Sequence, residues 1–446
     1  MGSTGTGKGV ILQNLVYQSI LSKKGIIIVD PKNDSFLPQV IKETLREENR
    51  PSEDLKICYY PNKWGYKAIT DDDSYLEISN KLIDMFDYTE SSNPGVDYYR
   101  SLGRTILRKL MKIFFMSLEL KKYIKKDFLD IKKHIILLKE DLQRQKDYDY
   151  EIGKTRPNAE LLEKYSKRYF NPEILKKMYF ANTDTESLDS LSIKFEEVTE
   201  GISFNSDIDI RDALYKGKII YFRVDMNDVA SLKWIKFLIT DIIQKSKKKI
   251  SNANIYLDEL SFYGSKTLAG ALATTRSMGL EFSMFLQAIS QLNDEIREDT
   301  IENCNFKMFY KTSNITTLDY IEKLGGIEAI TKVSTKNGDI SYSQDFESFL
   351  NVTKIRSLPR TSVAIAICEY LPFPEIIQTN YIETSKIFDW GIFQENNFNF
   401  KADENIKISK KDDVRKLEKY RVYLKENKNL LENSDLFGVV LGSKSI

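Results

Sequence analysis

The sequence is poor in the residues that build metal centres and disulfide frameworks. Its three cysteines, Cys58, Cys304 and Cys368, lie far apart and lack the spacing of zinc ligands, which favours free thiols in a reducing compartment. The only histidine, His134, falls in a lysine-rich helical run, so a catalytic triad or a His-ligated metal would depend on it alone. We interpret His134 as a solvated residue on a helix face.

Long apolar runs and an excess of charge are missing too. No stretch approaches the ~18 to 20 apolar residues that cross a bilayer, and the first residues do not resemble a signal peptide. We therefore expect the chain as given to be cytoplasmic. The 66 Lys and Arg residues nearly cancel the 65 Asp and Glu residues, so DNA would have to be bound by a local basic surface.

Two lysine-rich stretches are candidates for such a surface. Runs of like charge are more often solvated faces than phosphate-binding sites, and that alternative stays open for both stretches. The first contains Lys245, Lys247, Lys248 and Lys249, and the second contains Lys121, Lys122, Lys125, Lys126, Lys132 and Lys133.

Short apolar runs alternate with helical patterns, which is typical of an α/β domain with a mostly parallel sheet. The predicted strands are residues 25–30, 55–60, 218–224, 254–258, 281–287, 306–311 and 362–368. Between about residues 75 and 203, apolar residues recur at helical intervals, which predicts an all-helical insertion. We therefore divide the chain into the first part of the α/β domain (1–74), the insertion (75–204), the second part of the α/β domain (205–398) and a charged, helical tail (399–446).

A glycine-rich segment opens the chain and precedes a helical pattern. It consists of Gly2, Ser3, Thr4, Gly5, Thr6, Gly7, Lys8, Gly9 and Val10, and it fits the phosphate-binding pattern G-x-x-x-x-G-K. In such a loop the glycines let backbone N–H groups point at phosphate oxygens, and the lysine, here Lys8, supplies charge to the β and γ phosphates. Gly9 stands where a magnesium-binding Ser or Thr is usual. The alternative is a merely flexible glycine-rich terminus.

Two acids end the apolar strand 254–258 and suit an ATPase. Asp258 would orient magnesium and its waters, and Glu259 would polarise the attacking water as general base. Gln287, at the end of the next strand, would place its amide near the γ phosphate. Plain polar strand ends are the alternative for all three.

Three further charged residues are candidates for the same site. Arg276 is a permanently charged donor that could neutralise transition-state charge across a subunit interface, although a surface role is the alternative. Asp30 and Lys32 end the strand 25–30, where either a salt bridge or a nucleotide contact fits.

Several segments together resemble the type IV coupling proteins of bacterial conjugation and type IV secretion, members of the FtsK and HerA class of RecA-like motor ATPases. The resemblance covers residues 1 to about 385, with its segments in the expected order. They are Gly5-Thr6-Gly7-Lys8-Gly9-Val10, Val29-Asp30-Pro31-Lys32, the helix from Tyr98 to Leu110, Leu257-Asp258-Glu259-Leu260, Arg276 to Leu280, Gln287 to Leu292, Asn303 to Lys307 and Ile355 to Pro359.

The resemblance implies a RecA-like P-loop NTPase domain that is interrupted by an all-helical domain and uses ATP and Mg²⁺. It implies that Lys8 is the phosphate lysine, Asp258 the magnesium acid, Glu259 the catalytic base, Gln287 the γ-phosphate sensor and Arg276 a trans-acting arginine. One branch of the family also carries Gly after the loop lysine, as Gly9 does here.

The partners implied by the resemblance are DNA, a relaxase or relaxosome, and the proteins of a type IV secretion channel, with the motor assembled as a homo-hexamer. Family members carry a strand and transmembrane helices before the loop. The resemblance implies attachment to the cytoplasmic face of the inner membrane if the full-length protein carries such a region before Met1.

Two other functions remain open at this point. One is a related DNA-pumping ATPase of chromosome segregation, phage DNA packaging or defence. The other is a docking scaffold that binds nucleotide weakly and recruits protein substrates through the helical insertion and the charged tail.

Overall fold

The computed structural model of the protein describes residues 1–120, 126–154, 185–336, 339–361 and 363–395. The predicted tail (399–446) lies outside these ranges, as do Lys121, Lys122 and Lys125.

The central sheet has five parallel strands in the order β2-β5-β1-β6-β7. They are β1 (Gly25–Asp30), β2 (Leu55–Tyr59), β5 (Ile219–Arg223), β6 (Ala253–Leu257) and β7 (Leu280–Met284). The predicted α/β class with a mostly parallel sheet is therefore confirmed. The register pairs Val29 with Leu257 and Leu257 with Met284, so the carboxyl ends of β1, β6 and β7 meet at one edge.

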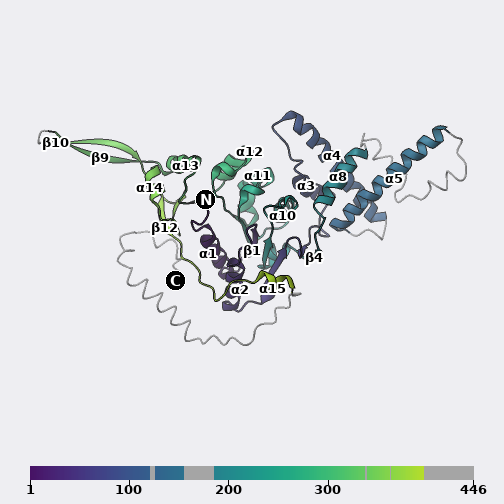
Figure 1. Ribbon diagram of the computed structural model, residues 1–446, viewed down its shortest axis with the longest axis horizontal. Coiled ribbons are helices and arrows are strands. Elements are labelled where there is room, and N and C mark those ends of the chain that lie inside the picture. The colour runs from purple at the N-terminus through teal and green to yellow at the C-terminus, as the bar shows by residue number, and fades with distance from the viewer. Residues whose placement is uncertain (121–125, 155–184, 337–338, 362, 396–446) are drawn as a thin grey trace. The chain divides into compact units, whose positions relative to one another are not determined.

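Side chains of β1 alternate between two apolar cores, one on each face of the sheet. Ile26 and Ile28 contact the core formed with α1 (Lys8–Leu21) and α2 (Leu37–Glu47). Figure 1 shows both helices beside β1. Ile27 and Val29 belong to the opposite core, which includes α10 (Val229–Lys248). The unbroken apolar run at positions 26–29 of β1 is thus explained by burial on both faces.

The helical insertion contributes to the second core. Its described helices are α3 (Tyr75–Met85), α4 (Pro94–Leu120), α5 (Phe128–Lys154) and α8 (Thr185–Glu197). The ring centroids of Phe128 and Trp234 lie 4.6 Å apart, which links α5 to α10. Before and after the insertion, β3 (Trp64–Tyr66) and β4 (Phe204–Ile208) pair in parallel. The domain boundaries given above stay a prediction.

The interpretation of His134 as a solvated residue is wrong. Its side chain is buried, and its ring lies edge-on to Phe114 with 5.2 Å between centroids. The lysines on either side of it in the sequence suggested a solvated face, but position 134 falls on the apolar stripe of α5 with Ile131, Ile135 and Leu138.

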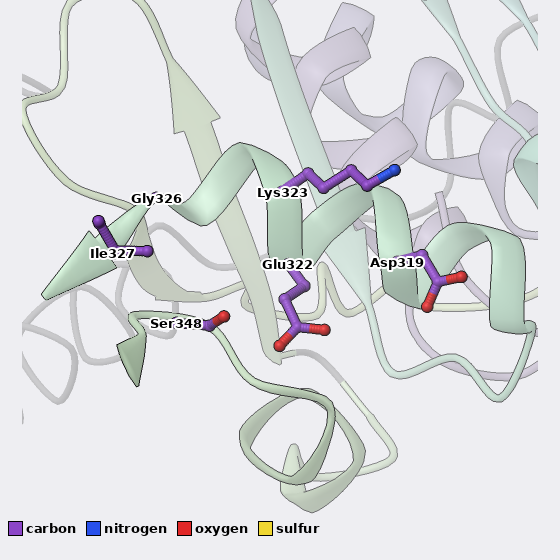
Figure 2. Close-up of a pocket in the computed structure, with 6 residues that line it drawn as sticks. All are labelled: Asp319, Glu322, Lys323, Gly326, Ile327 and Ser348. Carbon is purple, nitrogen blue, oxygen red and sulfur yellow. The ribbon is translucent and has the colours of Figure 1, made fainter. Parts of the chain in front are cut away.

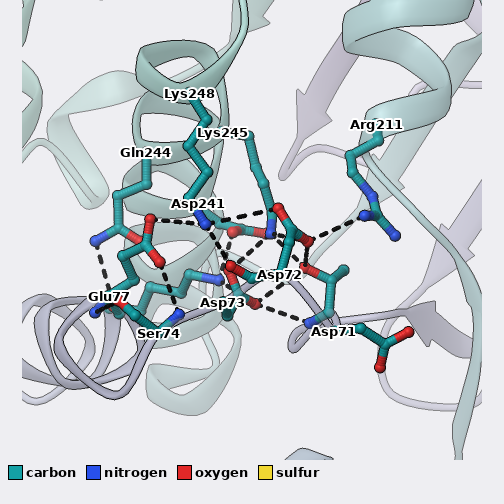
Figure 3. Close-up of polar contacts among 12 residues, drawn as sticks. Asp71, Asp72, Asp73, Ser74, Glu77, Arg211, Asp241, Gln244, Lys245 and Lys248 are labelled. Atoms are coloured by element: carbon teal, nitrogen blue, oxygen red, sulfur yellow. Dashed lines mark hydrogen bonds and ion pairs between the residues drawn. The ribbon is translucent and has the colours of Figure 1, made fainter.

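A buried network of ion pairs connects the insertion to the sheet domain (Figure 3). Lys81 Nζ on α3 lies 3.0 Å from Asp73 Oδ2 and 2.5 Å from Asp241 Oδ1 on α10. Lys245 Nζ lies 2.6 Å from Asp73 Oδ1. Tyr66 donates a hydrogen bond of 2.6 Å to Asp241 Oδ2. All five side chains are essentially inaccessible to solvent, so each charge depends on its partners.

A second sheet is antiparallel and has the order β12-β11-β8. It consists of β8 (Phe306–Tyr310), β11 (Val363–Cys368) and β12 (Glu375–Gln378). The predicted strands 306–311 and 362–368 are therefore confirmed as strands, but they pair with each other and not with the parallel strands. Apolar periodicity identifies a strand and does not reveal its partner.

The sequence pattern also missed a hairpin of β9 (Ile327–Lys336) and β10 (Asp339–Ser348), which follows α13 (Figure 1). Its register places Ile327, Val333 and Phe346 on one face, and each of these side chains is more than half exposed.

Further helices are α9 (Arg211–Lys216), α11 (Lys266–Thr275), α12 (Asp294–Glu302), α13 (Ile315–Gly325), α14 (Val352–Ser357) and α15 (Trp390–Glu395). Short 3-10 turns are formed by Ser52–Asp54, Leu260–Phe262, Arg276–Met278 and Ile289–Gln291. Within the described residues, none of the helices combines the length and apolar character that crossing a membrane requires.

Candidate functional site

The glycine-rich loop lies at the carboxyl edge of the parallel sheet and contacts both sheets. Gly2 N–H donates to the carbonyl of Leu286, just after β7, at 3.2 Å. Tyr310 N–H of β8 donates to the carbonyl of Met1 at 2.8 Å. A Cβ at position 2 would come within 2.5 Å of Tyr310 Cβ. Glycine at position 2 is therefore required by the close approach of β8.

The other glycines shape the turn into α1. Gly5 and Gly7 have φ of +75° and +112°, in the region that favours glycine. Gly7 is the N-cap of α1 and provides no side-chain cap, so the N–H groups of the first turn are available to an anion. A Cβ at Gly9 would meet no atom within 4 Å. The missing hydroxyl at position 9 is thus not imposed by packing.

Lys8 begins α1 and turns back across the loop. Its ammonium donates to the carbonyl oxygen of Gly2 and, at 3.2 Å, to that of Ser3. Burial, and next the charge of Lys32, lower the pKa of Lys8, while Glu259 and Asp258 act in the opposite direction. The charged groups of Lys8, Lys32 and the two acids therefore interact, although they come from the start of α1 and from the segments that follow β1 and β6.

Asp258 and Glu259 follow β6 directly and are both buried. Glu259 has φ 49° and ψ 49°, a left-handed conformation that costs a non-glycine residue about 1 kcal/mol or more. Its amide donates to Asp258 Oδ1 at 3.0 Å. Burial raises the pKa of Asp258, and the nearby ammonium of Lys32 opposes that rise. Strain of this kind in a pair of buried acids is typical of functional sites.

Gln287 and Lys32 complete the group around Glu259. Gln287 Nε2 donates to Glu259 Oε1 at 3.0 Å. Lys32 Nζ lies 2.5 Å from the same oxygen and 3.1 Å from Asp258 Oδ2. Burial lowers the pKa of Lys32, but the two carboxylates outweigh that effect and raise it. The salt bridge foreseen as one alternative for Lys32 is thus present.

Asp30 acts on the backbone next to this group. Its carboxylate accepts from the N–H groups of Lys32 (2.8 Å) and Asp34 (2.9 Å) and from the hydroxyl of Tyr221 (2.5 Å). Burial raises the pKa of Asp30, and these hydrogen bonds oppose the shift. The role of Asp30 is to fix the turn that presents Lys32. Tyr221, which the sequence reasoning missed, is recognisable only once β5 is known to neighbour β1.

Arg276 does not join this group within its own chain. It is exposed and precedes β7 at the amino end of the strand, whereas the loop contacts Leu286 beyond the carboxyl end. Five strand residues at about 3.3 Å each separate the two ends by roughly 16 Å. A role toward the nucleotide therefore requires a second subunit.

The lysine stretches differ from the predicted basic surfaces. The prediction of DNA contact is wrong for Lys245, which is buried and paired with Asp73. Lys248 Nζ pairs with Glu77 at 2.9 Å, and Lys249 lies over the ring of Tyr215. Sequence composition records the charges but not their buried partners, which is why this cluster looked basic.

In the second stretch, Lys126 donates to the carbonyls of Asp71 and Asp73, and Lys132 donates to Thr199 Oγ1. Lys133 and Lys247 are exposed. Lys133 and Lys247 therefore stay candidates for phosphate contact.

A pocket of about 350 Å³ lies away from the loop, between α13 and the foot of the β9–β10 hairpin (Figure 2). It is lined by Asp319, Glu322, Lys323, Gly326, Ile327 and Ser348. None of these residues belongs to the predicted site, so this pocket is separate from the loop and the acids.

The residues at the sheet edge fit a magnesium nucleotide. Glu259 Oε2 is buried without a hydrogen-bond partner, which leaves an acceptor that a water molecule can satisfy. The open space at Gly5 and Gly9 leaves room over the loop for phosphates. Within the described ranges no cluster of three or more metal-ligating side chains occurs, so a metal would be held by Asp258, the nucleotide and water.

The parallel sheet, the loop before α1 and the acids after β6 define a RecA-like P-loop NTPase fold. Within that class, the resemblance to type IV coupling proteins is confirmed. Residues 252–360 match the family described as "TraM recognition site of TraD and TraG". No curated protein sequence matches the chain.

Solved structures support the same resemblance at the level of the fold. The unbound bacterial conjugative coupling protein TrwB, lacking its first 70 residues, is 16% identical, with a TM-score of 0.59 over 86% of this chain and 84% of that one. TrwB in complex with ADP and Mg²⁺ is 16% identical, with a TM-score of 0.57 over 86% of this chain and 85% of that one. TrwB in complex with an ATP analogue gives a TM-score of 0.56 at 16% identity, over 86% and 84% of the two chains.

Proposed function

We propose that the chain is the motor part of an ATP-driven DNA translocase that couples a relaxase–DNA complex to a type IV secretion channel in conjugation. The observation that carries the proposal is the meeting of Lys8, Asp258, Glu259 and Gln287 at one edge of a parallel sheet. Three separate segments supply these residues, and each residue type suits one part of nucleotide hydrolysis.

Each residue has a role that its position allows. The N–H groups of the loop and the N-terminus of α1 bind phosphate oxygens. The Lys8 ammonium leaves the carbonyl oxygens of the loop and binds the phosphate in their place. Asp258 would hold Mg²⁺, and the metal would neutralise phosphate charge when bound. Glu259 accepts a proton from the attacking water, and Gln287 orients the Glu259 carboxylate through its amide.

The assembly that we propose is a homo-hexameric ring around DNA. In a ring with head-to-tail interfaces, a residue far from its own loop can reach the loop of a neighbour. Arg276 has such a position and is the proposed trans-acting arginine. DNA would meet Lys133 and Lys247 as local charges, because the chain as a whole is nearly neutral.

The test is ATP turnover with and without DNA. Lys8→Ala and Glu259→Gln should each lower the DNA-stimulated rate by at least ~100-fold, since general base catalysis alone contributes roughly 10² to 10⁴. Lys24→Met, which removes an exposed ion pair with Glu281, is the matched control and should keep the wild-type rate. Unchanged turnover in Glu259→Gln would contradict the assigned base.

A second candidate is a docking scaffold that binds nucleotide weakly. The hydrogen bonds of Lys8 to its own loop carbonyls and the missing hydroxyl at Gly9 favour it. Calorimetry with ADP separates the two functions. Magnesium-dependent binding supports the motor, and no binding with or without magnesium leaves the scaffold.

A further inference from the structure

The acid pair after β6 contains its own cation. Lys32 Nζ bridges Asp258 Oδ2 (3.1 Å) and Glu259 Oε1 (2.5 Å). The two carboxylate side chains are 12% and 1% exposed, whereas that of Lys32 is 36% exposed. Neighbouring buried carboxylates repel each other and are poorly hydrated, so a cation between them offsets both penalties.

Lys32 is the sole cation paired with Glu259 among the residues that the structure describes. The remaining partner of Glu259 Oε1 is the neutral amide of Gln287, and Oε2 is buried without a hydrogen-bond partner. Lys8 donates to the carbonyls of Gly2 and Ser3 and forms no ion pair with the acids. Lys32 is therefore the cation in direct contact with Glu259, whereas Lys8 acts on the acids only over a longer distance.

The backbone of Lys32 is fixed independently of this ion pair. Its N–H donates to Asp30 Oδ1, and Asp30 is held in turn by Tyr221 on the neighbouring strand. The turn after β1 thus presents the lysine at the sheet edge, while its side chain, about one-third exposed, has room to move toward solvent. The two acids, which follow buried β6, lack that freedom.

We propose that Lys32 is a positioning residue that acts as the internal counter-ion of the acid pair. In the nucleotide-free protein its ammonium takes the place of a divalent cation between Asp258 and Glu259 and holds Glu259 against Gln287. A divalent cation and the Lys32 ammonium then compete for the same carboxylates. The identity of the natural cation rests on the proposed function, but the ion pair and the competition do not.

The experiment measures the melting temperature of the nucleotide-free protein in EDTA and in MgCl₂. The variants are Lys32→Met, Lys32→Arg, Glu259→Gln and the double variant Lys32→Met/Glu259→Gln, with Lys24→Met as the control for an exposed ion pair. In EDTA, Lys32→Met should melt at least ~3 °C below wild type, because it leaves a buried charge uncompensated. Lys24→Met should stay within about 1 °C of wild type.

Two results distinguish a counter-ion from a lysine that merely packs. Glu259→Gln should restore most of the melting temperature lost in Lys32→Met, since it removes the uncompensated charge. MgCl₂ should raise the melting temperature of Lys32→Met more than that of wild type or Lys32→Arg, because only the first exposes the carboxylates to the metal. If Lys32→Met does not fold alone, recovery of soluble protein in the double variant supports the proposal.

Other results overturn it. A Lys32→Met protein that melts with wild type in EDTA, or one that Glu259→Gln does not rescue, shows that the lysine is not the counter-ion. An equal response of wild type and Lys32→Met to MgCl₂ refutes the competition. ATP turnover of the wild-type protein is measured in parallel. If the wild type hydrolyses ATP but Glu259→Gln does not rescue Lys32→Met, this inference alone is refuted. If Glu259→Gln rescues Lys32→Met but the wild type does not hydrolyse ATP, the proposed function alone is refuted.

Discussion

Replacing Lys81 with methionine tests how the insertion is fastened to the sheet domain. The change keeps the length and apolar stem of the side chain and removes its charge. Asp73 retains Lys245 at 2.6 Å, whereas Asp241 retains the hydrogen bond from the hydroxyl of Tyr66 at 2.6 Å and only a longer-range interaction with the charge of Lys245. The penalty therefore falls on Asp241, which is fully buried.

The size of that penalty is limited by protonation. A carboxylate without a counter-ion can take a proton instead, at a cost of about 1.4 kcal/mol per pH unit above its ordinary pKa of about 3.9. At pH 7 the limit is about 4 kcal/mol, which agrees with the ~3 to 5 kcal/mol that breaking a buried ion pair costs. At pH 5 the same limit is about 1.5 kcal/mol. Lys81→Met should thus lose about 3 to 4 kcal/mol at pH 7 and about 1.5 to 2.5 kcal/mol less at pH 5.

The sign of the pH dependence of the stability loss follows from the direction in which the pKa of Asp241 is shifted. Burial already raises the pKa of Asp241 in the wild type, and Lys81 opposes that shift. Without Lys81 the folded-state pKa of Asp241 rises further above the unfolded value. The extra penalty of the variant is absent below the folded-state pKa of Asp241 in the wild type and grows as the pH rises toward the higher folded-state pKa in the variant. Acidification from pH 7 to pH 5 should therefore narrow the gap between variant and wild type.

The assay is urea unfolding followed by circular dichroism at pH 5, 6 and 7, because urea does not screen charges as guanidinium does. Lys248→Met is the control, since Lys248 forms an ion pair with Glu77 but is one-third exposed, and it should cost less than about 1 kcal/mol at every pH. A loss in Lys81→Met that does not change between pH 5 and pH 7 would refute the reasoning, because it would assign the cost to packing.

Two further predictions concern the loop and DNA. Gly2→Ala should lower the free energy of unfolding by about 1 to 3 kcal/mol because its Cβ would meet Tyr310, whereas Gly9→Ala should change it by less than about 0.5 kcal/mol. Chemical unfolding measures both free energies, and equal losses in the two variants would contradict the contact between position 2 and Tyr310. Lys247→Glu should reduce the slope of log affinity for DNA against log salt by about one, as filter binding measures, and an unaltered slope argues against phosphate contact at Lys247.

The parallel sheet and the acids of the site were predictable because their signals are local. The strand Gly25–Asp30 contains an unbroken apolar run at positions 26–29, and Asp258 and Glu259 stand directly after the mostly apolar strand Ala253–Leu257. A parallel sheet places the carboxyl ends of β6 and β7 at one edge, so topology brings Glu259 and Gln287 together. Lys8 reaches this edge through the hydrogen bonds of the loop to Leu286 and Tyr310.

The parts that sequence did not reveal depend on contacts between distant segments. Lys245 is part of a lysine run by sequence and of a buried network by structure, because Asp73 lies 172 positions away. The partner of Lys32 was left open between nucleotide and salt bridge, since no pattern in the turn after β1 specifies Glu259. The left-handed backbone of Glu259 has no sequence signal either, because the residue is neither glycine nor asparagine.

The hydrogen bonds of the first two residues connect the glycine-rich loop to both sheets. Met1 is bonded to Met308 and Tyr310 of the antiparallel sheet, and Gly2 is bonded to Leu286 beyond the parallel sheet. The loop is thus hydrogen-bonded to two different sheets. The antiparallel sheet includes β8, which is followed in the chain by α13 and the β9–β10 hairpin. A change in the position of Met1 or Gly2 would therefore alter hydrogen bonds to both sheets at once.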